Sequence, residues 1–88
     1  MKSIRKFALA ANNLTIEQCR GARAMLGWSQ AELAKASNVS RQTIADFERG
    51  AHMPINNNLT SITSAFREAG IEFTSDEGVG IRFKKPGA

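Results

Sequence analysis

The chain has 88 residues, one cysteine and a formal net charge of +4 at pH 7, with 12 lysines and arginines against 8 acidic residues. This length accommodates one domain, whose small core would gain from a partner subunit. A single cysteine excludes an internal disulfide and fits a reducing compartment. The basic balance suits an anionic partner such as nucleic acid. No apolar stretch is long enough to span a membrane, so we expect a cytoplasmic protein.

Residues 1–13 form an N-terminal extension, which the sequence leaves open as an arm, a short helix or a strand. The first clear helix follows it. Thr15 and Gln18 have the spacing of a capping box, in which each side chain satisfies a backbone N–H of the other residue. Apolar residues then recur at helical spacing until Gly27, which is typical of a helix end.

Two short helices are expected next. A second capping box begins at Ser29, and the helix it starts ends near Asn38, a residue that tolerates the left-handed conformation of a sharp turn. Ser40 is expected to cap the following helix. Ile44 and Phe47 lie on one face of that helix, which we expect to face the core.

The last part of the chain changes from helical to strand periodicity. The run of asparagines at 56–58 offers caps for a fourth helix that Gly70 ends. Apolar residues then alternate with polar ones on both sides of a turn-rich loop at 74–80, which predicts a β-hairpin. The expected organisation is an extension at 1–13, a helical domain at 14–70, and a hairpin with a basic tail at 71–88.

One string of residues is more specific than the helix pattern. It runs from Gly27 to Ala34, continues from Val39 to Ile44, and closes with Phe47-Glu48-Arg49-Gly50. This string resembles the phage repressor and Cro type of helix-turn-helix, the xenobiotic response element (XRE) family. The resemblance covers about 14–70 and implies a mainly α fold, with four to five repressor-like helices before the hairpin. It also implies a transcriptional regulator, a repressor or repressor/activator, that binds a double-stranded DNA operator. One such domain covers only a few base pairs, so we expect a homodimer that reads an inverted repeat.

The helix that begins after Ser40 carries side chains suited to reading bases. Arginine pairs with the acceptors of guanine, and glutamine pairs with the donor and acceptor of adenine. Asp46 lies one turn beyond Gln42, where it would accept from cytosine or orient Arg41 or Gln42, and Arg49 is better placed for phosphate. The resemblance implies a phosphate contact for Gln30, and the alternative is a capping or solvent-exposed side chain. The expected DNA-binding set is Gln30, Ser40, Arg41, Gln42, Thr43, Asp46 and Arg49.

Other singled-out residues are expected to serve the fold. The resemblance implies a partly buried ion pair between Arg23 and Glu48, and the position of Arg23 on an apolar helix face agrees, because an unpaired charge there would be costly. We interpret Trp28 and Cys19 as core residues. His52 is expected to be solvated, and the pair Lys84-Lys85 to belong to a soluble tail, although contact with DNA or a partner stays open.

The hairpin is the basis of our hypotheses about assembly. Four apolar residues need a cover, and the open edge of a two-stranded sheet can pair with another strand. We therefore expect a homodimer interface formed by Ile71, Phe73, Ile81 and Phe83. One alternative is that the hairpin folds back on its own helices, which leaves dimerisation to the fourth helix or to DNA alone. Another is that the chain is an antitoxin that represses its own operon while its tail binds a toxin. No catalytic set, metal cluster or phosphate loop is visible, so neither an enzyme nor a cofactor is expected. A regulatory protein partner stays open.

Overall fold

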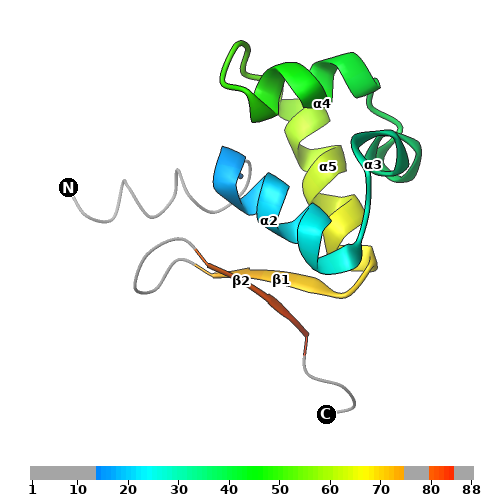
Figure 1. The fold of residues 1–88 in the computed structure, drawn as a ribbon, viewed down its shortest axis with the longest axis vertical. Coiled ribbons are helices and arrows are strands. Elements are labelled where there is room, and N and C mark those ends of the chain that lie inside the picture. The colour runs from blue at the N-terminus through cyan, green and yellow to red at the C-terminus, as the bar shows by residue number, and fades with distance from the viewer. Residues whose placement is uncertain (1–13, 75–79, 85–88) are drawn as a thin grey trace, which may run out of the picture.

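The computed structural model describes residues 14–74 and 80–84. In these residues four helices precede one antiparallel pair of strands (Figure 1). The expected extension at 1–13, most of the hairpin loop and Lys85 lie outside the described residues. The elements in chain order are α2 (Ile16–Leu26), α3 (Gln30–Ser37), α4 (Arg41–Glu48), α5 (Asn56–Glu68), β1 (Ile71–Thr74) and β2 (Gly80–Phe83). The mainly α fold with a C-terminal hairpin is thereby confirmed.

Local capping explains where α2 begins and ends. The Thr15 hydroxyl accepts a hydrogen bond from the backbone N–H of Gln18 at 3.0 Å, and the Gln18 side chain accepts one from the N–H of Thr15 at 3.0 Å. These bonds satisfy two donors that the first turn of a helix leaves unpaired. Gly27 ends the helix in the left-handed conformation with φ of 69°, which favours glycine because it has no Cβ.

The turn between α3 and α4 also follows from its caps. Ser29 and Glu32 form the second capping box, and the Ser40 hydroxyl accepts from the backbone N–H of Thr43. Between the helices, Asn38 adopts φ of 62°, and Val39 is buried in the core beside it. Local hydrogen bonds thus fix where α3 and α4 begin, and the left-handed Asn38 marks where α3 ends.

The start of α5 differs from the expectation. The N-cap residue is Ile55, which provides no side-chain hydrogen bond, and the asparagines at 56–58 lie inside the first turn. The prediction that one of these asparagines caps the helix is therefore wrong. Pro54 precedes the cap and is buried. We infer that proline, which disfavours helical backbone in the residue before it, helps to keep the preceding chain out of the helix.

The hairpin packs against the helices of its own chain. β1 pairs with β2 in a register that places Ile71 opposite Phe83 and Phe73 opposite Ile81. Ile71 is fully buried, and the Phe73 ring lies edge-on to Phe66 of α5 with ring centroids 5.9 Å apart. Figure 1 shows the hairpin at the end of the molecule opposite α4, with α2 and α5 between them.

A single apolar core lies between the helices and the hairpin. Its largest fully buried side chains are Phe47, Phe66, Leu33, Ile44, Ile62, Ile71 and Cys19. Trp28 covers one side of this core, where its ring stacks on Phe66 at 5.9 Å between centroids. Trp28 and Cys19 are therefore core residues, as expected. No described helix is long and apolar enough to cross a membrane.

Candidate nucleic-acid interface

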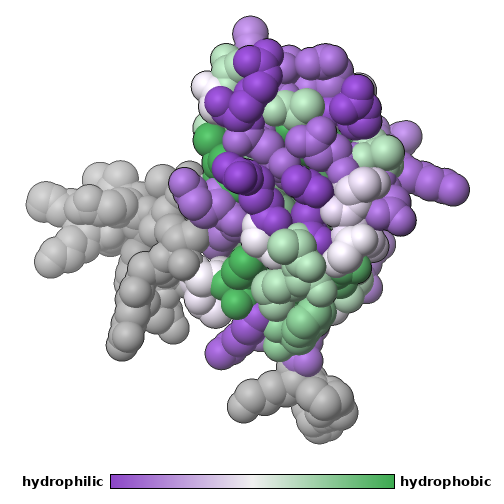
Figure 2. Space-filling view, viewed as in Figure 1, coloured by the Kyte–Doolittle hydropathy of each residue, from purple (hydrophilic) through white to green (hydrophobic). Residues whose placement is uncertain are grey.

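The two faces of α4 have opposite character. Ile44, Phe47 and Glu48 are buried, whereas Arg41 and Gln42 are exposed in the first turn. The first turn is fixed by Ser40, whose hydroxyl also donates to the Thr43 hydroxyl at 2.8 Å. In Figure 2 the surface over this end of the molecule is dominated by hydrophilic residues. The fold thus presents hydrogen-bonding side chains to solvent from a helix whose other side is anchored in the core.

A chain of polar contacts continues along the exposed face of α4. The Gln42 amide nitrogen Nε2 donates to Oδ1 of Asp46 at 2.9 Å, and Arg49 donates to the same oxygen from Nη2 at 2.9 Å. The hydrogen bond from Gln42 and then the one from Arg49 lower the pKa of Asp46 below its ordinary value. Asp46 therefore contacts Gln42, one of the two residues that the sequence expected it to orient, and also Arg49.

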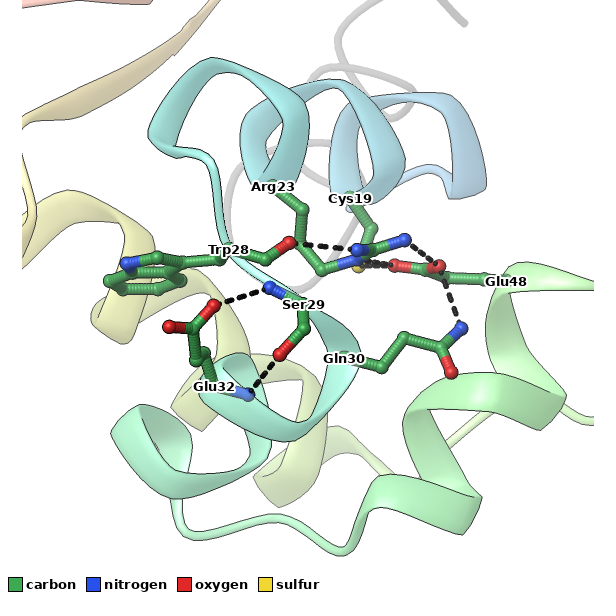
Figure 3. Close-up of polar contacts among 7 residues, drawn as sticks. All are labelled: Cys19, Arg23, Trp28, Ser29, Gln30, Glu32 and Glu48. Carbon is green, nitrogen blue, oxygen red and sulfur yellow. Dashed lines mark hydrogen bonds and ion pairs between the residues drawn. The ribbon is translucent and has the colours of Figure 1, made fainter.

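A second cluster joins α2, α3 and α4 below that face (Figure 3). Arg23 donates from Nε to Oε2 of Glu48 and from Nη2 to Oε1, each at 2.8 Å. Its Nη1 donates to the backbone carbonyl of Trp28 at 2.9 Å. The side chains of Arg23 and Glu48 are only 20% and 5% exposed. The expected ion pair is thus present and mostly shielded from water.

Two further donors reach the same carboxylate. The thiol of Cys19 donates to Oε2 of Glu48 at 3.1 Å, and the Gln30 amide nitrogen donates to Oε1 at 3.1 Å. Burial by itself would raise the pKa of Glu48, but the hydrogen bonds from Arg23, Gln30 and Cys19 outweigh it and hold the pKa below 4.5. Burial, reinforced by the bond to Glu48, raises the pKa of the Cys19 thiol far above its usual value.

The position of Gln30 adds a contact that the sequence did not indicate. Gln30 is the first residue of α3 and is half-buried, and its amide is held by Glu48 across the gap between α3 and α4. The expectation from the sequence was a phosphate contact, and the alternative was a solvent-exposed side chain. No pattern in the sequence places Gln30 beside Glu48, because that contact depends on the angle between the two helices.

The four hairpin residues expected at a dimer interface lie in different environments. Ile71 is fully buried in the core of the single chain, so its side chain has no surface left for a partner. Phe73 and Ile81 are partly buried against the same core, and Phe83 is 53% exposed. Figure 2 shows apolar surface gathered at the hairpin end of the molecule. The hairpin therefore folds back on its own helices while leaving part of its apolar surface exposed.

The side chains of His52 and Lys84 are exposed. His52 lies in the connection between α4 and α5, and Lys84 follows β2, where its backbone N–H donates to the carbonyl of Gly70 at 2.7 Å. Within the described ranges, no group of three or more histidine, cysteine, aspartate or glutamate side chains is arranged to hold a metal ion.

Two capped helices joined by a left-handed turn, with a polar outer face on the second, define a helix-turn-helix DNA-binding protein. Comparison with protein families agrees. The family described as helix-turn-helix, of the Cro/C1 or XRE type, matches residues 20–68, more than half of the chain. The chain belongs to this family, whose members bind DNA and are typically not enzymes. No curated protein matches it.

Proposed function

We propose that the chain is a sequence-specific regulator of transcription that reads double-stranded DNA through the first turn and exposed face of α4. The observation that carries the proposal is the exposure of Arg41 and Gln42 on a helix whose opposite face is buried. A major groove admits one helix, and a helix anchored in this way offers its outer side chains to base edges. Ser40, Thr43, Asp46 and Arg49 complete the proposed DNA-facing set. Because its DNA lies inside the cell, the protein would act there.

Gln30 is proposed to anchor the domain on the DNA backbone. It stands at the start of α3, where backbone N–H groups and the helix dipole attract a phosphate. The Glu48 contact uses one N–H of the Gln30 amide. The other N–H and the carbonyl oxygen are not consumed by that bond. Glu48 would then hold the Gln30 amide in place, while the second N–H of that amide donates to a phosphate oxygen.

We further propose that the protein acts as a two-fold dimer and reads an inverted repeat. One domain covers few base pairs, whereas two would read half-sites about 34 Å apart. Phe83 and the exposed parts of Phe73 and Ile81 are the proposed contact surface. This hairpin is folded on its own helices, as judged from residues 71–74 and 80–84. That supports a regulator over an antitoxin, whose toxin-binding tail is expected to lack such packing.

Selection of bound duplexes from a random-sequence pool tests the DNA proposal. The wild-type protein should return a defined site with inverted symmetry. Arg41→Ala and Gln42→Ala should each relax the preference at particular base pairs, whereas Arg67→Ala should leave the site unchanged. Arg67 is an exposed residue at the far end of α5, so this control removes a positive charge away from α4. Failure of the wild-type protein to enrich any sequence would refute sequence-specific reading.

Sedimentation at several protein concentrations tests the dimer. Phe83→Ser should shift the equilibrium toward monomer without changing the helical circular dichroism. The matched control is Met53→Ser, which removes another exposed apolar side chain, 68% exposed, from the connection between α4 and α5. Deleting the hairpin is a poorer test, because it would also remove Ile71 from the core. Equal dimerisation of the wild type and Phe83→Ser would exclude Phe83 from the interface.

A further inference from the structure

Three polar side chains lie in a row along the exposed face of α4. Gln42 and Asp46 are four residues apart, and Arg49 follows three residues later, spacings that bring side chains together on one face of a helix. Oδ1 of Asp46 accepts from both neighbours at 2.9 Å. The DNA-reading role proposed for α4 gives Gln42 a base to read and includes Asp46, but it does not say what the contact between these two residues does.

The chemistry of the carboxylate determines which way the Gln42 amide faces. An ionised carboxylate only accepts hydrogen bonds, so only the NH₂ end of the amide can turn toward Asp46. The flipped amide would bring two acceptor oxygens together. With one N–H given to Asp46, Gln42 still offers its second N–H and its carbonyl oxygen. The second N–H and the carbonyl oxygen therefore keep fixed positions, and they do not exchange places by rotation of the amide.

Arg49 keeps this arrangement in place near DNA. A lone carboxylate on the DNA-facing side would be repelled by phosphates, but Arg49 compensates its charge by direct contact. Hydrogen bonds from Gln42 and Arg49 also lower the pKa of Asp46, which keeps the group ionised and acceptor-only at neutral pH. The side chain of Asp46 is 24% exposed and that of Arg49 is 68% exposed, so both are accessible from the solvent.

We propose that Asp46 is a positioning residue that fixes the direction of the Gln42 amide and so makes α4 select adenine at one base pair. Adenine presents an acceptor, N7, beside a donor, the N6 amino group, in the major groove. The N–H and carbonyl oxygen that Gln42 retains match this pair in one order only. The inference rests on the proposed DNA-reading role of α4 and assigns the specificity at Gln42 to a residue that need not touch the base.

Asp46→Asn is the informative variant. Asparagine has nearly the same shape but carries both a donor and an acceptor, so it can hold Gln42 in either direction. Removing the negative charge should also strengthen binding to every sequence, so affinity alone is not the readout. The readout is the ratio of affinities for the selected duplex and for duplexes changed at single base pairs, all at one salt concentration.

The experiment compares five proteins on duplexes taken from the random-pool selection. Gln42→Ala identifies the base pair that depends on Gln42. When that base pair is changed, the wild-type protein should bind the selected duplex roughly 5- to 140-fold more tightly than the altered one. This ratio corresponds to the free energy of a good bidentate contact. Asp46→Asn should reduce this affinity ratio toward one at the same base pair and leave the ratios at the other base pairs unchanged. The double variant should match Gln42→Ala there, and Glu17→Gln on α2 should behave as wild type.

Two results would overturn the inference while leaving specific DNA binding by α4 intact. If Asp46→Asn changes affinity for all duplexes equally and keeps the ratio at the Gln42 base pair, Asp46 acts only through its charge. If it changes the ratio at a different base pair, Asp46 contacts a base directly. A wild-type protein that selects no sequence would instead remove the proposed function and the inference with it. Thermal melting of each variant corrects for the folded fraction.

Discussion

Arg23 of α2 and Glu48 at the end of α4 form a bidentate ion pair with both nitrogen–oxygen distances at 2.8 Å. The pair links α2 to the last turn of α4, the helix that exposes Arg41 and Gln42. Arg23 also bonds the carbonyl of Trp28, just before α3. One guanidinium therefore connects three parts of the domain, and we infer that it stabilises their relative orientation rather than contacting DNA.

Arg23→Ala should destabilise the protein by about 3 kcal/mol, the low end of the cost of leaving a buried charge without its partner. The low end is appropriate because the Arg23 side chain is 20% exposed. Urea denaturation followed by circular dichroism measures the change. DNA affinity per folded molecule should fall much less than stability. Arg20→Ala is the matched control, since Arg20 is an exposed arginine on the same helix.

A double-mutant cycle with Glu48→Ala isolates the pair itself. Residues in direct contact show coupling of about 0.5–3 kcal/mol. The loss in the double variant should therefore be smaller than the sum of the two single losses by an amount in this range. Additive losses would contradict an energetic link between Arg23 and Glu48, whatever their distance.

Stability should fall below about pH 4.5 because of Glu48. Its pKa is lowered in the folded protein, so between that value and the ordinary 4.5 the unfolded chain binds more protons than the folded one. The stabilisation is thus complete above about pH 4.5 and is lost as the pH falls through the folded pKa. Denaturation midpoints measured from pH 7 to pH 3 should show a shallower acid decline for Glu48→Gln than for wild type.

The control for Glu48→Gln is a variant of a second acidic residue whose pKa is also lowered. Asp46 is such a group, but it lies on the exposed face of α4 rather than in the buried cluster. Asp46→Asn should therefore change the acid decline less than Glu48→Gln does. If the two variants changed it equally, the buried cluster would not be the main source of the acid sensitivity.

Cys19 should be inert in the folded protein. Its side chain is fully buried, and burial raises the thiol pKa, so the reactive thiolate is scarce even in mild alkali. At pH 8 a thiol reagent should label it slowly, at a rate that follows unfolding and increases in urea. In an Ala36→Cys variant, the added cysteine on the exposed face of α3 should label at once, leaving one slow thiol per chain. Rapid native labelling of both thiols would contradict the burial of Cys19.

The features that sequence reasoning predicted well are local ones. The capping boxes at Thr15 and Ser29 and the left-handed turn at Asn38 depend on residues a few positions apart. Their hydrogen bonds form within a single turn, so the residue types and spacing are sufficient. The asparagines at 56–58 were misread for a related reason. Asparagine is a good N-cap residue, so composition alone does not say which position begins the helix. In the structure the helix follows Pro54 and Ile55, and Ile55 is the N-cap.

The features that sequence reasoning missed depend on how the elements pack. Alternation correctly predicts that one face of the hairpin is apolar, but it does not say what covers that face. The structure buries Ile71 against the chain's own helices and leaves Phe83 half exposed. The contact between Gln30 and Glu48 spans two helices and likewise depends on their angle. The ion pair of Arg23 with Glu48 was expected through the family resemblance together with the cost of burying a charge.

Gln30→Ala should weaken binding to all DNA sequences alike. If the amide held by Glu48 donates to a phosphate, its loss removes one hydrogen bond to a charged group, which contributes about 1.5–3 kcal/mol. Phosphate contacts carry no base information, so the ratio between the selected and altered duplexes should stay constant. Gln42→Ala is the matched control and should change that ratio. Because Gln30→Ala also removes a bond to Glu48, affinities must be normalised to the folded fraction. An unchanged affinity for non-specific DNA after that correction would limit Gln30 to a structural role.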